Sequence, residues 1–218
     1  MKKRTGSRNQ SNSRSSSRKR TTAPSRSRGR SPLSQEWLKQ FLSEMLAVEH
    51  GGVELYDRAL EELSHDDLRS RLEQFHEQTQ RHVELCEEML NAAGSNEDEM
   101  SPGAEAAEHK AQGLLSADVP EELKDINNLE NLVLAETKDH WNWEMLAAVM
   151  DQIEERDLKK IVSRAVREVR RQENDHLTWT QKMLTKLATE AAHQPPEMEE
   201  EGEEGEEEDE EAGAEQDY

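Results

Sequence analysis

The sequence predicts an all-α protein whose central part is a four-helix bundle, made of two helical hairpins joined by a long crossover. Four segments place apolar residues at alternating steps of four and three, which is the spacing of helices packed along one another. The connection between the hairpins, residues 95–125, is long enough to run back along a bundle. The composition (35% charged, 32% hydrophobic and 4% aromatic) favours one helical domain with polar extensions.

The first hairpin is predicted to consist of helices over residues 34–63 and 66–93. Ser34 is the expected N-cap of the first helix, residues 64–67 form the turn, and Gly94 ends the second helix. The expected buried seams are Leu38, Leu42, Met45, Glu49, Gly52, Tyr56, Ala59 and Leu63 in the first helix, and Leu68, Leu72, Phe75, Thr79, His82, Cys86 and Met89 in the second.

The second hairpin is predicted over residues 125–153 and 156–190, with its turn near Glu155. A short helix is expected at 105–115 within the crossover. The expected seams are Leu129, Val133, Glu136, His140, Trp143, Ala147 and Met150 in the first helix of this hairpin, and Leu158, Val162, Ala165, Val169, Glu173, His176, Thr180, Met183 and Leu187 in the second. The two hairpins resemble a diverged duplication, because Glu49 and Tyr56 have the spacing of Glu136 and Trp143.

Both ends of the chain are predicted to be disordered tails. Residues 1–33 are rich in Ser and Arg, with eleven Lys or Arg and no acid, and residues 195–218 contain fourteen Asp or Glu and no base. The bundle between them, residues 34–194, is itself strongly acidic and would repel nucleic acid. Non-specific binding of nucleic acid is therefore expected only of residues 2–30. Pairing of the basic tail with the acidic tail is the alternative.

A cytoplasmic protein is predicted. Cys86 is the one cysteine, which excludes an intramolecular disulfide and favours a reducing compartment. No apolar run approaches the roughly 20 residues that a membrane span needs, and the basic N-terminus lacks the apolar stretch of a secretory signal. No membrane contact is expected.

Six polar positions lie at one level of the predicted bundle. Glu49 and Glu136 each stand alone on a helix, whereas Thr79 with His82 and Glu173 with His176 are pairs three residues apart. In each hairpin the lone glutamate and the pair lie at similar distances from the turn, about 15 and 16 residues in the first and about 19 and 19 in the second. Glu73 and His76 have the same spacing but fall short of this level by roughly 9 Å, so they are rejected.

Buried carboxylates and imidazoles are costly without partners, by several kcal/mol for each isolated charge. Six such positions at one level therefore predict a metal site. A hydrogen-bonded polar layer that needs no metal is the alternative. Tyr56 and Trp143 are expected to serve as core packing, and His140 as a core or rim residue.

These residues resemble the ferritin-like diiron-carboxylate superfamily, including its small bacterial, rubrerythrin-like and stress-induced members. The superfamily places a lone glutamate on two helices and Glu-x-x-His on the other two. Glu49-x6-Tyr56 is similar to the first-helix pattern of ferritin and bacterioferritin, and residues 75–83 are similar to the second helix of the small stress-induced members. The resemblance covers about residues 34–190. It implies Glu49, His82, Glu136, Glu173 and His176 as metal ligands.

Thr79 departs from the superfamily pattern, because it stands at the sixth ligand position, where a bridging glutamate is expected. A hydroxyl is a poor ligand, which leaves open a single metal, an asymmetric pair completed by water, or a decayed site. Ferritin-like bundles occur as monomers, dimers and cages. Two tails make a monomer or a small homo-oligomer the expectation.

The resemblance implies iron or manganese, with a diiron pair as one form of the site. The expected activity is that of an oxidoreductase of ferroxidase or peroxidase type, which oxidises Fe(II) or consumes peroxide in stress protection. The alternative is a non-enzymatic stress or nucleic-acid-associated protein that has a decayed metal site and a DNA-binding basic tail.

Overall fold

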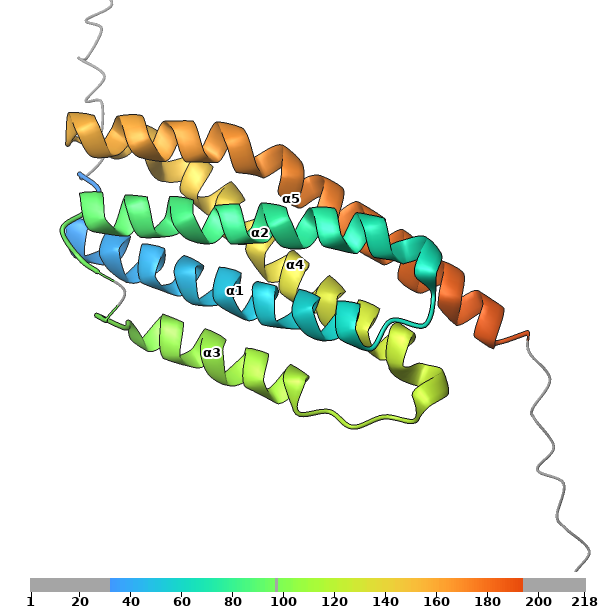
Figure 1. Cartoon of the computed structure of the whole chain (residues 1–218). Helices are drawn as coiled ribbons and strands as arrows, with labels where there is room; N and C mark the ends of the chain where they lie inside the picture. The colour runs from blue at the N-terminus through green and yellow to red at the C-terminus, as the bar shows by residue number, and fades with distance from the viewer. Residues whose placement is uncertain (1–31, 97, 194–218) are drawn as a thin grey trace, which may run out of the picture. The chain divides into compact units, whose positions relative to one another are not determined.

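A computed structural model describes residues 32–96 and 98–193 (Figure 1). This part of the chain is all-α, as predicted. Its α-helices are α1 (Gln35–Glu61), α2 (Asp66–Ala92), α3 (Pro102–Leu115), α4 (Lys124–Val149) and α5 (Arg156–Ala191), with the 3-10 turns η1 (Glu121–Leu123) and η2 (Met150–Gln152). None of the described helices is both long and apolar enough to cross a membrane.

The four long helices form the bundle. In the first hairpin α1 packs against α2, and in the second α4 packs against α5, while α1 contacts α4 and α2 contacts α5 to join the hairpins. The crossover carries α3, which lies along the outer side of α1 (Figure 1). This helix begins three residues before the predicted segment, because Pro102 is favourable in a first turn and the Ser101 hydroxyl accepts a hydrogen bond from the Ala104 amide.

Local capping explains where α1 and α5 begin and where α2 ends. The Ser34 hydroxyl caps α1 by accepting from the Trp37 amide at 3.2 Å, and the Glu155 carboxylate caps α5 by accepting from the Asp157 amide at 3.0 Å. Gly94 follows α2 with a φ of 76°, a conformation that glycine adopts at little cost. The turn between α1 and α2 is held from outside, since Asp125 accepts from the amides of Ser64 and His65.

The predicted seam of α4 is right at Leu129, Glu136 and Trp143 and wrong at its other positions. Val133, His140, Ala147 and Met150 are half-buried, whereas Leu132, Asp139 and Leu146 face the interior. Steps of four and three from Leu129 reach either set, because residues 3 and 4 positions apart lie on adjacent sides of the same face. The packing of α4 between α1 and α5 decides which set is buried.

Two apolar clusters lie on either side of the predicted polar layer. One contains residues such as Leu42, Met45, Met89 and Val162, and the other contains residues such as Leu55, Phe75 and Leu132. The polar layer is therefore enclosed along the bundle axis by apolar side chains, which keep water away from it.

The predicted tails lie outside the described residues, apart from Pro32 and Leu33. The division into 1–33, 34–194 and 195–218, the nucleic-acid contact of residues 2–30 and the small oligomer or monomer all stay predictions.

Candidate metal centre

Six buried acidic and histidine side chains meet at the middle of the bundle, and all four long helices contribute. They form two triads in which potential ligand atoms lie within 4.8 Å of one another. The first triad is Glu49 from α1, His82 from α2 and Asp139 from α4. The second is Glu136 from α4 with Glu173 and His176 from α5. None of the six is more than 6% exposed.

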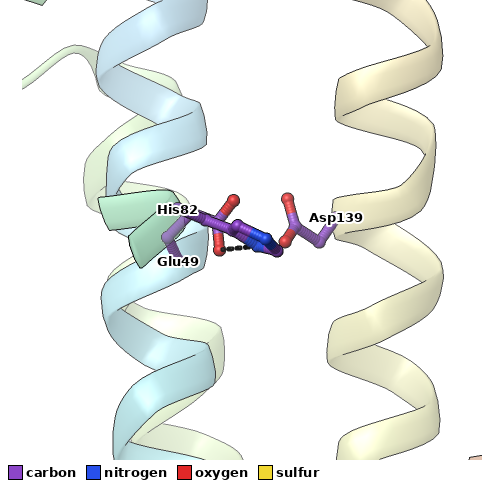
Figure 2. Close-up of side chains that lie close together, drawn as sticks. All are labelled: Glu49, His82 and Asp139. Carbon is purple, nitrogen blue, oxygen red and sulfur yellow. Dashed lines mark ion pairs between the residues drawn. The ribbon is translucent and has the colours of Figure 1, made fainter. Parts of the chain in front are cut away.

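In the first triad, carboxylates approach the His82 ring from two helices. Nδ1 of His82 lies 3.5 Å from Oε2 of Glu49, and Asp139 points toward the ring from the far side (Figure 2). Asp139 was not among the residues predicted from the sequence. It lies three residues after Glu136 and hence on the same face of α4, which is the signal that could have identified it.

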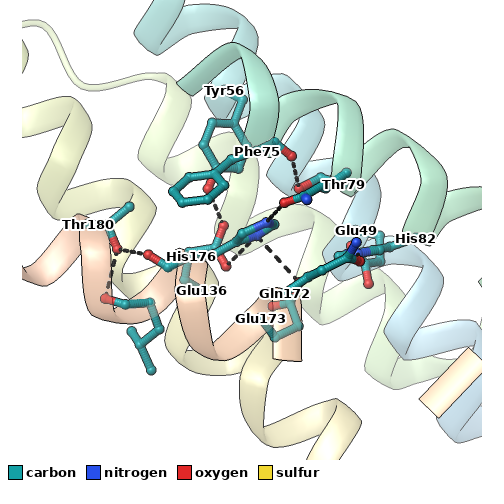
Figure 3. A network of polar contacts seen from close by, with 12 residues as sticks. Glu49, Tyr56, Phe75, Thr79, His82, Glu136, Gln172, Glu173, His176 and Thr180 are labelled. Carbon is teal, nitrogen blue, oxygen red and sulfur yellow. Dashed lines mark hydrogen bonds and ion pairs between the residues drawn. The ribbon is translucent and has the colours of Figure 1, made fainter. Parts of the chain in front are cut away.

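In the second triad, Glu173 lies between the two histidines. Its Oε1 is 3.0 Å from Nδ1 of His82 and 3.5 Å from Nδ1 of His176. Nδ1 of His176 also lies 3.4 Å from Oε2 of Glu136 (Figure 3). The two imidazole rings are nearly parallel, with centroids 5.8 Å apart. Glu173 therefore contacts the histidines of both triads.

Two aromatic residues hold the lone glutamates in place. The Tyr56 hydroxyl donates to Oε1 of Glu136 at 2.5 Å, and the Trp143 indole N–H donates to Oε1 of Glu49 at 2.8 Å. Each bond runs from one hairpin to the other, which preserves the internal symmetry noted in the sequence. These residues were expected to be core packing alone. They are fully buried, and they also orient the carboxylates.

Two glutamines fix the outer side of the histidine rings. Oε1 of Gln172 accepts from Nε2 of His82, and Oε1 of Gln78 accepts from Nε2 of His176, both at 2.8 Å. With Nε2 occupied in this way, Nδ1 is the ring nitrogen that faces the carboxylates. Each glutamine directly precedes Glu173 or Thr79 in the sequence, but sequence reasoning had not identified either one.

Thr79 belongs to neither triad. Its hydroxyl donates to the Phe75 carbonyl at 3.0 Å within its own helix. A β-carbon added to Gly52 would lie 3.3 Å from the Thr79 methyl, so the small residue and the threonine pack together. In the internal duplication, Gly52 of the first hairpin corresponds to Asp139 of the second, and Thr79 corresponds to Glu173. A carboxylate from α4 is thus present in the first triad, whereas α2 places none there.

The rejected pair Glu73 and His76 lies away from this layer. Glu73 is exposed, and Nε2 of His76 forms an ion pair with Asp57 at 3.0 Å. An acid and a histidine three residues apart are therefore not sufficient to form a site in this bundle.

The two triads contain most of the buried polar atoms that lack a hydrogen-bond partner. Among the described residues, nine buried side-chain nitrogen or oxygen atoms have no hydrogen-bond partner, and seven of them belong to the triads. They are Oε2 of Glu49, Nδ1 of His82, Oε2 of Glu136, Oδ1 of Asp139, both oxygens of Glu173 and Nδ1 of His176. Such atoms are rare in proteins because each costs about 1–3 kcal/mol, or more when charged. Two cations would satisfy them.

The electrostatics also favour cations at this centre. Burial raises the pKa of Glu173 to about 7, and the nearby Glu136 adds to the rise. Burial, Glu173 and Glu49 together raise the pKa of Asp139 well above its usual range. Four carboxylates within one buried layer repel one another, and two divalent cations would balance their four negative charges.

His82 and Tyr56 hold protons in the metal-free centre, and His82 would release its proton on binding a metal. Burial lowers the pKa of His82, but Glu49 and Glu173 outweigh burial and hold it well above 6.5. Burial and the adjacent Glu136 raise the pKa of Tyr56 well above 10. The phenol therefore stays protonated and donates to Glu136 over the whole physiological range of pH.

Comparison with known proteins gives one family. A family model described as "Domain of unknown function (DUF892)" matches residues 34–193. No curated protein and no solved structure gives a significant match. The matched residues make up more than half of the chain and contain every helix that contributes to the two triads. The chain belongs to the DUF892 family.

Proposed function

We propose that this chain is a ferritin-like metalloprotein that holds two iron or manganese ions between its hairpins. The observation that carries the proposal is the convergence of seven potential ligand atoms that lack a hydrogen-bond partner, from four helices, on one buried layer. Carboxylate and imidazole donors in this ratio suit iron and manganese. The proposed ligands are Glu49, His82 and Asp139 for one ion, with Glu136, Glu173 and His176 for the other.

Glu173 is the proposed bridge between the two positions, because its Oε1 lies near Nδ1 of both histidines. Tyr56 and Trp143 leave one oxygen each of Glu136 and Glu49 free to face the centre. The glutamine bonds at Nε2 direct Nδ1 of each histidine toward the same space. The side chains are thus positioned by outer partners before any ion binds.

Iron held there would supply one-electron redox chemistry, with Fe(II) as the substrate of a ferroxidase or peroxide as the substrate of a peroxidase. The chain's own contribution is a dry site, since the two apolar clusters flank the layer. Protection against oxidative stress is the role that these reactions suggest.

Metal titration of the full chain tests this proposal. Purified protein stripped with a chelator is titrated with Fe(II) without oxygen, or with Mn(II), and bound metal is measured after desalting. We expect about two ions per chain. The double variant Glu173→Ala/His176→Ala should lose most of this binding, whereas Glu73→Ala/His76→Ala, which removes the same residue types outside the two triads, should retain it.

Helical circular dichroism shows whether each variant is folded, and the milder Glu173→Gln replaces the double variant if that one is not. Wild-type protein that retains no iron or manganese would refute the proposal. Equal loss in the two double variants would also refute it. Rates of Fe(II) oxidation with oxygen and with hydrogen peroxide then distinguish the two substrates.

A further inference from the structure

The first half of α5 is basic in a bundle that is otherwise acidic. Residues 156–171 carry seven Lys or Arg and only two acids, Asp157 and Glu168. Arg156, Lys160, Arg164, Arg167 and Arg171 are all exposed. They follow one another at steps of four, four, three and four, and hence occupy one side of the helix, an arc of about 80°. These five residues are called the basic face.

Most of the basic face has no counter-charge within the described residues. Arg164 pairs with Glu88, but Arg156, Lys160, Arg167 and Arg171 form no ion pair with any described residue. Elsewhere on this half of α5 the bases are paired, as Arg170 is with Glu144 at 2.6 Å and Lys159 with Asp151 at 3.7 Å. Like charges side by side on a helix repel one another, so this surface favours an anionic partner.

Toward the helix C-terminus the same side of α5 is mostly polar and uncharged, with the exposed Asp175 at its edge. The exposed residues along it are Asn174, Thr178, Lys182, Thr185 and Thr189. This polar strip connects the basic face to the end of α5 at Ala191. The acidic residues of the chain's own C-terminus, fourteen in 197–218, follow directly in the sequence.

We propose that the acidic segment Glu197–Glu211 binds along this side of α5 in the same chain, with its run Glu206–Glu211 at the basic face. The lengths agree. Arg171 and Arg156 lie roughly 30 Å and 52 Å from Ala191 along the helix axis, at about 1.5 Å per residue. The run begins 15 residues after Ala191, so an extended chain spans roughly 50 Å to reach it.

Covalent attachment favours this occupant over others of the same charge. The segment is part of the chain, so its local concentration near α5 is in the millimolar range that short tethers give. Duplex nucleic acid would also meet acids that border the basic face, among them Glu88 and Glu168. A single peptide strand is narrow enough to follow the face alone.

Carbodiimide cross-linking of the full chain, with peptides identified by mass spectrometry, tests the proposal because this reagent joins carboxylates to amines in direct contact. Lys160 and Lys182 are the amines on the proposed path, and the exposed Lys110 on α3, off this path, is the control amine. We expect the acidic segment to link to Lys160 and Lys182, but not to Lys110. The links should fade in about 0.5 M NaCl, where the Debye length is about 4 Å.

A matched pair of variants isolates the basic face. Arg156→Gln/Arg167→Gln/Arg171→Gln should reduce the links to Lys160 several-fold. Arg69→Gln/Arg71→Gln/Arg81→Gln, which removes the same charge from α2, should not. Arg69 and Arg71 are half-buried and the other four arginines are exposed, so circular dichroism checks that the bundle persists in both variants.

Three outcomes would overturn the proposal. Links from the acidic segment only to Lys2, Lys3 or Lys19 would show that it pairs with the N-terminal basic segment. Links between isotope-labelled and unlabelled chains in a mixture would assign the segment to a second copy. Duplex DNA binding that the α5 variant weakens, with no links at Lys160, would make the basic face a nucleic-acid surface.

Discussion

Replacing Glu173 with glutamine is expected to stabilise the metal-free protein at alkaline pH and to weaken strongly its stabilisation by metal. Glutamine keeps the shape of the side chain but carries no charge. Burial, with Glu136 beside it, raises the pKa of Glu173 from 4.5 to about 7. At about 1.4 kcal/mol per pKa unit, the ionised side chain costs the folded metal-free protein about 3 kcal/mol at pH 8.

The direction in which stability changes with pH follows from proton binding. Below pH 4.5 both the folded and the unfolded states hold the proton, and the charge of Glu173 costs nothing. Between pH 4.5 and about 7 the unfolded state releases the proton first, so stability falls as pH rises. The difference between variant and wild type should therefore be small at pH 4.5 and reach about 3 kcal/mol at pH 8.

Urea unfolding of the chelator-treated full chain, followed by circular dichroism, measures this difference. Glu73→Gln is the matched control, because Glu73 also precedes a histidine by three residues but is exposed. Addition of Mn(II) should then raise the unfolding midpoint of wild type and of Glu73→Gln, but raise that of Glu173→Gln far less.

Two results would refute the reasoning. One is a wild-type stability, relative to Glu173→Gln, that does not fall between pH 4.5 and 8. The other is equal stabilisation of both proteins by Mn(II), which would place the metal away from Glu173.

Three other changes probe separate parts of the molecule. Asp139→Asn should lower bound metal from about two ions to about one per chain, measured by metal analysis; unchanged stoichiometry would exclude Asp139 as a ligand. Asp125→Asn should cost about 1–3 kcal/mol at pH 7. Burial raises the pKa of Asp125, but hydrogen bonds from the turn at Ser64 outweigh burial and lower it below 3.8, so the loss should vanish in urea melts at a pH below the folded pKa. Gly51→Ala would place a β-carbon 2.7 Å from that of Ala111 and should cost about 1–3 kcal/mol in thermal melts, whereas Gly113→Ala, with nothing within 4 Å, should gain about 0.5–1 kcal/mol.

The helices and three of the four seams could be predicted because they depend on local order. Alternating steps of four and three, Ser34 before a helix and Gly94 after one are properties of neighbouring residues. The seam of α4 could not be assigned in the same way. Its sequence offers two sets of residues at allowed spacing, and the choice depends on contacts with α1 and α5.

In the candidate site too, part of the arrangement follows from local sequence and part depends on tertiary contacts. Turn-to-residue distances were enough to bring Glu49 near His82 and Glu136 near His176, since rise per residue converts sequence distance into height along the bundle. The hydrogen-bond partners of these side chains come from the opposite hairpin. Gln78 and Gln172 therefore carry no local signal of their role, and the bonds of Tyr56 and Trp143 also cross between hairpins.

The sequence by itself determined an all-α bundle with a layer of acids and histidines at one height, because helical periodicity and rise are set within each segment. Only the tertiary structure decided which acid accompanies Glu49 and His82. Asp139 enters that triad from α4, while Thr79 keeps its hydroxyl bond within α2. The physical reason is that a ligand group is defined by convergence in space. Four helices can supply a missing carboxylate from any face that packing turns inward.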